Sequence, residues 1–171
     1  MRRAAILFLA YLCSGSLALA AQEHHHELSM EEVGSVHFLV SCSKGVELSF
    51  NRAVALLHSF QYEQARQAFS EISAQDPTCA MAQWGVAMSH YHGLWDNGDT
   101  PTGRLALKKA AELAASNATT TAREKSYVEA LAEIYAEDGK DAAAHSRVFE
   151  KKMAKCKLLI PATTKPPFSM R

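Results

Sequence analysis

The sequence has little glycine, little proline and few aromatic residues: 8 glycines, 5 prolines and 8% aromatic residues in a chain of 171. Scarce glycine and proline, together with many alanines and few β-branched runs, favour an all-helical domain over a sheet. The chain also lacks net charge, because 18 basic residues match 18 acidic ones. Nucleic-acid binding normally needs a basic stripe, so this balance argues against a nucleic-acid partner.

Motifs of common catalytic sites are missing as well. The sequence contains no G-x-S-x-G, no H-E-x-x-H and no glycine-rich phosphate loop. It has no C-x-x-C-H, the sequence that attaches haem covalently. We therefore expect no enzymatic activity and no cofactor.

The first twenty residues have the features of a signal peptide. Arg2 and Arg3 supply a basic start, residues 4–12 form an apolar run, and an A-x-A site ends at Ala20. We expect cleavage between Ala20 and Ala21, so that the protein is exported, either to a periplasm or out of the cell. The apolar run is too short to cross a bilayer, and we expect no membrane span.

Residues 50–77 carry the clearest helical pattern. Apolar residues recur with a period of about 3.6 on both sides of a break at residues 59–62, which predicts two amphipathic helices in an antiparallel hairpin. The second helix must stop before Pro77, because the residue that precedes a proline avoids the α region. The apolar faces are formed by Phe50, Ala53, Val54 and Leu57 in the first helix, and by Ala65, Ala68, Phe69 and Ile72 in the second.

This hairpin resembles a tetratricopeptide repeat, whose pattern is W-x2-L-G-x2-Y, then A-x3-F, then P. Ala65, Phe69 and Pro77 match the second half of that pattern. In the first half, Ser49 and Arg52 are polar where the family packs apolar residues. The resemblance extends over residues 46–155 and implies antiparallel helical hairpins stacked as a superhelical array.

Four further helices are expected after this hairpin. Thr100-Pro101 is a cap and first-turn pair that opens one of them. Thr121 and Glu124 have the T-x-x-E spacing of a capping box, which opens the next. The expected positions are residues 80–91 for the third helix, from 100 for the fourth, from 121 for the fifth and 141–155 for the sixth. The prediction is an all-α fold of about six helices.

The expected organisation is a signal peptide (1–20), an extended N-terminal arm (21–45), a helical domain (46–156) and an irregular tail (157–171). The tail contains three prolines and no helical period. A repeat array needs a further helix or a polar cap against its last apolar face, and the tail resembles neither. We therefore expect the chain to be a truncated or frame-altered form of a longer protein.

The resemblance also implies where a partner would bind. In tetratricopeptide proteins the concave surface is built mainly from the first helix of each hairpin. Here the corresponding face carries Phe50, Asn51, Val54 and His58, and the implied partner is a protein or a peptide. For His58, simple placement on the surface is the alternative.

Three cysteines, Cys42, Cys79 and Cys156, follow the signal peptide. An exported protein can form disulfides. Two alternatives stay open for Cys42 and Cys79: a bridge that clamps the first hairpin to the segment before it, or two small buried thiols. With that bridge, Cys156 is left without a partner.

His24, His25 and His26 suggest a second function. Neutral imidazoles bind transition metals, and His37 and Cys42 lie near enough in the sequence to join them. The spacing matches no defined zinc motif, so a solvated polar run is the alternative. The leading hypothesis is a non-catalytic exported interaction module, and the other is a periplasmic metal-binding protein with the helices as its scaffold.

Overall fold

The computed structural model describes residues 33–93, 99–139 and 141–158. This part of the chain is all-α, which confirms the predicted fold class and the expectation of about six helices. None of the described helices is long and apolar enough to cross a membrane. The elements are a short 3₁₀ helix η1 (Lys44–Val46) and the α-helices α2 (Glu47–His58), α3 (Tyr62–Gln75), α4 (Ala80–His90), α5 (Thr100–Ser116), α6 (Ala122–Ile134) and α7 (Ala142–Leu158).

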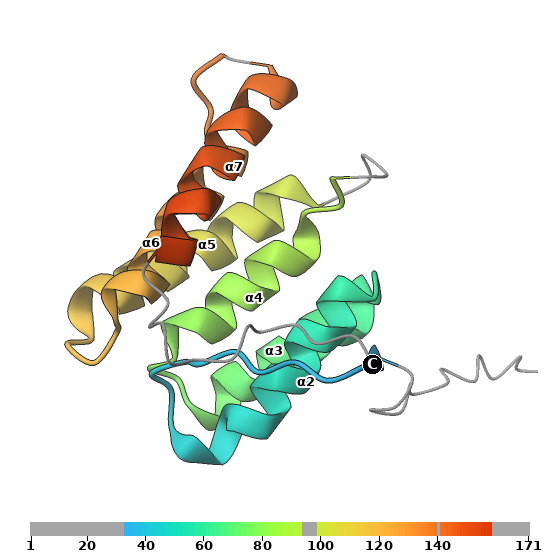
Figure 1. Ribbon diagram of the computed structural model, residues 1–171, viewed down its shortest axis with the longest axis vertical. Coiled ribbons are helices and arrows are strands. Elements are labelled where there is room, and N and C mark those ends of the chain that lie inside the picture. The colour runs from blue at the N-terminus through green and yellow to red at the C-terminus, as the bar shows by residue number, and fades with distance from the viewer. Residues whose placement is uncertain (1–32, 94–98, 140, 159–171) are drawn as a thin grey trace, which may run out of the picture.

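The helices follow one another as three hairpins, α2 with α3, α4 with α5, and α6 with α7. Helix α4 is central, because it contacts α2, α3, α5 and α6. In Figure 1 the first hairpin and α7 lie on opposite sides of α4. The core therefore runs from hairpin to hairpin along the chain, with α4 connecting the two ends.

Two helix starts show how local signals set the boundaries. Helix α6 has the predicted capping box, in which Thr121 and Glu124 satisfy each other's free backbone N–H groups. The sequence predicts Thr100 as the cap of α5, and this prediction is wrong, because the cap is Asp99 and Thr100 is the first residue of the helix. The Asp99 carboxylate accepts the Thr102 N–H at 3.1 Å, and a carboxylate also suits the positive end of the helix dipole.

The end of α2 has an unusual residue. The Gln61 N–H donates to the Leu56 carbonyl at 3.0 Å, and the Phe60 N–H donates to the Leu57 carbonyl at 3.2 Å. These two bonds are those of a Schellman motif, in which the residue after the cap is left-handed and is usually glycine. Here that residue is Phe60, with φ of 60° and an exposed side chain. The break predicted at residues 59–62 is thus a left-handed turn.

Helices α3 and α4 approach closely at Gly85. A Cβ atom at this position would lie 2.3 Å from the ring of Phe69, which is fully buried. Glycine therefore lets the Phe69 ring lie directly on the backbone of α4. Phe50 meets the same ring edge-on from α2, at 5.4 Å between centroids. The first three helices are joined by these contacts.

Candidate functional site

Of the N-terminal arm expected at residues 21–45, the structure describes residues 33–43 as the segment that leads into η1, and from here on we call these residues the arm. The arm crosses α2 in the view of Figure 1. Helices α2, α4 and α6 are the first helices of the three hairpins, and each contacts the next. We call their shared side the first-helix face. The arm lies on this face, because its buried residue Phe38 contacts all three helices.

Four rings form a cluster where the arm meets the face. Phe38 lies 5.7 Å from Phe50 of α2, 6.1 Å from Trp84 of α4 and 5.3 Å from Tyr127 of α6, measured between centroids. Burial raises the pKa of the Tyr127 phenol, which keeps this ring uncharged at neutral pH. The guanidinium of Arg123 lies 5.3 Å above the Phe38 ring, within the range of a cation–π contact.

The backbone of the arm is held by side chains of the same helices. The Phe38 N–H donates to Asn51 Oδ1 at 2.8 Å. Three residues further along, the Ser41 N–H donates to Glu124 Oε1 at 2.6 Å. Arg123 donates to the Leu39 carbonyl. Each of these bonds joins the arm to a residue that is distant in the sequence, and together they set the register of the arm on the face.

A disulfide between Cys42 and Cys79 anchors the end of the arm. Of the two alternatives that the sequence left open, the structure has the bridge, while Cys156 is a buried free thiol. Beside the bridge, Asp76 accepts the Ser43 N–H at 2.8 Å. Burial opposes ionisation of Asp76, but hydrogen bonds from Ser43 and Thr78 outweigh it and hold the carboxyl pKa below its ordinary value.

The same residues form the one group of potential metal ligands found in the described part of the chain. Cys42, Asp76 and Cys79 place one ligand atom each within 4.8 Å of the others. Both sulfurs are used in the disulfide, so they offer no thiolate to a metal while the bridge is intact. For the same reason Cys42 is not a free ligand that could join the N-terminal histidines. His37 is exposed.

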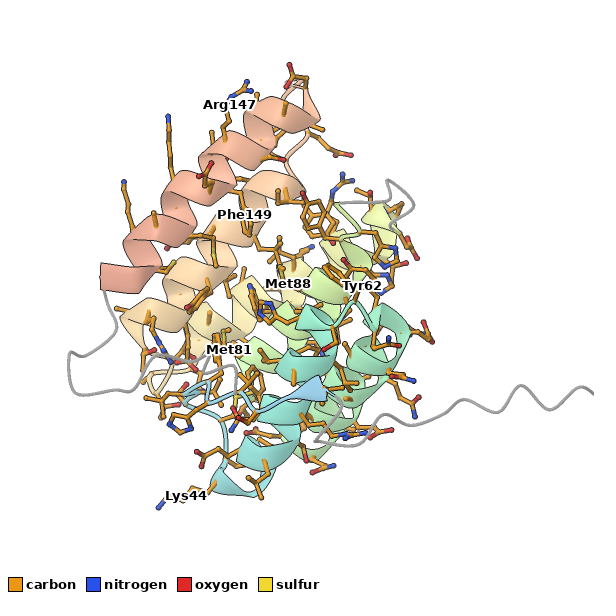
Figure 2. The ribbon with its side chains drawn as sticks, turned by 45° about the vertical axis from the view of Figure 1, so that its right-hand side comes forward. Lys44, Tyr62, Met81, Met88, Arg147 and Phe149 are labelled. Atoms are coloured by element: carbon orange, nitrogen blue, oxygen red, sulfur yellow. A yellow bond between two sulfur atoms is a disulfide. The ribbon has the colours of Figure 1, made fainter. Side chains whose placement is uncertain are left out.

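A cavity of about 500 Å³ continues from the ring cluster along the first-helix face. Phe38, Trp84 and Tyr127 form its wall on the side of the arm, and the remainder of the lining is mainly apolar. Figure 2 labels Tyr62 and Met88, which both line it, and shows Met88 between α7 and the first hairpin. The other lining residues are Leu57, His58, Phe60, Tyr91, Gly93 and Met153.

Aromatic side chains crowd one end of this cavity. Tyr62 stacks on His92 at 4.2 Å and meets Phe60 edge-on at 6.3 Å, measured between centroids. Phe60 remains 54% exposed, although it is a large apolar residue in a strained backbone conformation. Left-handed backbone costs a non-glycine residue about 1–2 kcal/mol, and such strain is concentrated at functional sites in proteins. This combination marks the rim of the cavity.

The residues predicted to bind a partner fall into two groups. Phe50, Asn51 and Val54 are buried, because the arm and the neighbouring helices cover them. In this conformation they are not accessible to a partner, and a partner reaches them only after the arm has moved. His58 is exposed and lies in the lining of the cavity. Of the four predicted residues, the structure thus leaves accessible only the last residue of α2.

Several predictions concern residues outside the described part of the chain. These are the signal-peptide cleavage between Ala20 and Ala21, the histidines His24, His25 and His26, and the irregular tail. Of the expected tail, residues 157 and 158 belong to α7, which ends at Leu158 and not at residue 155. The rest stays a prediction.

Sequence reasoning missed the residues that define the site. Phe38 lies in a segment with no helical period, and Met88 lies in the third expected helix, where the apolar pattern does not distinguish a cavity wall from core packing. Phe60 carries a signal only once its backbone conformation is known, because a left-handed residue at the end of a helix is usually glycine and sometimes asparagine. A bulky aromatic residue at this position therefore suggests that its side chain has a role other than forming the turn.

Comparison of the chain with protein-family models, with curated proteins and with solved structures finds no match. The features that bear on function are therefore those of the first-helix face: the ring cluster, the bound arm and the open apolar cavity.

Proposed function

We propose that the protein is a non-catalytic, exported interaction module, a tetratricopeptide-like array whose first-helix face binds a protein or peptide. The observation that carries the proposal is the apolar cavity of about 500 Å³ with the exposed, left-handed Phe60 at its rim. Pockets of this size with aromatic linings are typical of binding sites, and aromatic residues dominate the binding energy of interfaces. No covalent chemistry is required.

The order of helix contacts supports the array. Each first helix contacts the first helix of the next hairpin, α2 with α4 and α4 with α6, in addition to its hairpin partner. Such stacking leaves one continuous face for a ligand. The polar residues that depart from the repeat pattern fit as well, since Ser49 and Arg52 line a polar groove between α2 and α3. At that place a polar side chain remains in contact with water.

The disulfide supports export. Disulfides persist in oxidising compartments and are rare where thiols are kept reduced. The bridge between Cys42 and Cys79 also closes a loop that contains the whole first hairpin, so it stabilises the part of the face next to the cavity. A periplasmic or secreted location is compatible with both the bridge and the N-terminal signal.

The test is a selection of binding peptides from a phage-displayed library of random peptides, with the purified full chain as target. Selected peptides are then titrated against wild type, Met88→Lys and Leu105→Lys. Met88 is half-buried in the cavity wall, so a lysine can fill the cavity while its ammonium reaches water. Leu105 is 70% exposed on α5, outside the cavity, and is the matched control.

At least about a tenfold loss of affinity is expected for Met88→Lys and none for Leu105→Lys, since a desolvated contact at an interface centre is worth about 1.4 kcal/mol or more. The proposal fails if no peptide is enriched, or if the selected peptides bind all three proteins equally.

A further inference from the structure

The arm occupies the first-helix face in the way that an extended peptide ligand would. Its backbone is bound at two points three residues apart, by Asn51 at Phe38 and by Glu124 at Ser41. Its one buried aromatic side chain inserts among Phe50, Trp84 and Tyr127. Backbone hydrogen bonds that set register, combined with a pocket for a particular side chain, are the general features of extended-peptide recognition.

The fit of the arm is incomplete. The indole N–H of Trp84 is buried and has no acceptor among the described residues, although the ring stacks on Phe38. A buried donor without an acceptor is costly, and native structures contain few of them. The cavity also continues past Phe38, so the arm fills only part of the face. A longer segment that supplied an acceptor and filled the cavity would bind better than the arm does.

The attachment of the arm makes it an intramolecular competitor. The Cys42–Cys79 bridge and the Ser43–Asp76 hydrogen bond hold one end of the arm. The residues before Cys42 are held without covalent bonds, by the Phe38 ring, by hydrogen bonds to Asn51 and Glu124, and by apolar packing of Val33, Val36 and Val40 against the core. A tethered segment competes at an effective concentration set by the tether, and it lowers the apparent affinity of a free ligand by the fraction of time that the face is open.

We infer that the partner is an extended peptide segment with an aromatic residue that takes the place of Phe38, and that the arm is a built-in competitor for it. The inference rests on the proposed function and adds the chemistry of the partner. Asn51 and Glu124 bind the partner's backbone N–H groups three residues apart, and the cavity receives the side chains that flank its aromatic residue.

The test uses two fluorescein-labelled peptides in fluorescence anisotropy titrations. One has the sequence SVHFLVS of residues 35–41, and the other, SVHALVS, lacks the ring. Each peptide is titrated with three forms of the full chain: wild type, Phe38→Ala and Leu39→Ala. Leu39 is the matched control, because its side chain is 36% exposed and it contacts Arg123 through its carbonyl.

The phenylalanine peptide is expected to bind Phe38→Ala at least about tenfold more tightly than it binds wild type, because the competitor has lost its anchor. Its affinity for Leu39→Ala should equal that for wild type. The alanine peptide should bind Phe38→Ala at least about tenfold more weakly than the phenylalanine peptide does. Equal affinity of the two peptides, or no binding of the phenylalanine peptide to a Phe38→Ala chain with native circular dichroism, overturns the inference.

Hydrogen–deuterium exchange on wild type provides a measurement that needs no variant. With the phenylalanine peptide at millimolar concentration, the amides of Phe38 and Ser41 should exchange faster, because the peptide displaces the arm from Asn51 and Glu124. Unchanged protection overturns the inference. Library-selected peptides that depend on Met88 but bind wild type and Phe38→Ala equally would overturn it too, while leaving the proposed function intact.

Discussion

Glu124 both caps α6 and binds the arm. Its replacement by glutamine exchanges the carboxylate for an amide of the same shape. The side chain is 1% exposed. Oε2 accepts the Thr121 N–H and the Thr121 hydroxyl, both at 2.7 Å, and Oε1 accepts the Ser41 N–H at 2.6 Å. All three partners are donors, so both oxygens are needed as acceptors.

In Glu124→Gln one oxygen becomes an NH₂ group, which cannot accept. Whichever way the amide turns, it faces at least one donor, either at Thr121 or at Ser41. A hydrogen bond to a charged group contributes about 1.5–3 kcal/mol, and a buried donor without an acceptor costs about 1–3 kcal/mol. Loss of the charge also removes a desolvation cost, so we expect a net loss of about 2 kcal/mol in the free energy of unfolding.

Urea unfolding followed by far-ultraviolet circular dichroism measures this loss, with Glu129→Gln as the control. Glu129 lies in the same helix with an exposed side chain, so its replacement should change stability by less than about 0.5 kcal/mol. In Glu124→Gln the Ser41 amide should also exchange faster with deuterium. An equal effect of both substitutions, or full protection of Ser41 in Glu124→Gln, would refute the assigned role of the carboxylate.

Three further substitutions test other parts of the structure. Gly85→Ala should destabilise by about 1–3 kcal/mol in urea unfolding, because the new Cβ would lie 2.3 Å from the Phe69 ring; Gly45→Ala, with open space at its Cβ, should not destabilise. Phe60→Gly should stabilise by about 0.5–1 kcal/mol by relieving the left-handed strain and should weaken peptide binding; a loss of stability contradicts this reasoning. Because the folded pKa of Asp76 is lowered, its contribution to stability is present above the unfolded pKa of about 3.9 and is lost as pH falls through the folded value. Melting temperatures of Asp76→Asn should therefore depend less on pH below about pH 4 than those of wild type; parallel curves would exclude this.

The helices were largely predictable because their signals are local. The stop before Pro77 and the capping box at Thr121 each depend on residues within four positions along the chain, and both appear in the structure. The cap of α5 shows the limit of such signals. Asp99 and Thr100 are both good capping residues, and only the backbone geometry decides that the Asp99 carboxylate meets the Thr102 N–H.

The candidate site was predictable only in part. The resemblance to the repeat family drew attention to the face of α2, yet Phe50, Asn51 and Val54 are covered in this conformation. Nothing in the local sequence places Phe38 against them, because the arm has neither helical period nor repeat pattern. Among the predicted residues, His58 alone lies in the lining of the open cavity.

From the sequence alone one could predict the all-α character of the described part of the chain, the approximate extent of its six α-helices and the capping box that joins Thr121 to Glu124. The packing of the three hairpins is needed to see that the second oxygen of Glu124 accepts the Ser41 N–H, 83 positions away, and that the arm occupies the first-helix face. The difference lies in how far apart along the chain the interacting residues are. Periodicity and capping act within one helical turn, whereas the bound arm and the cavity depend on how three hairpins are placed relative to one another in space.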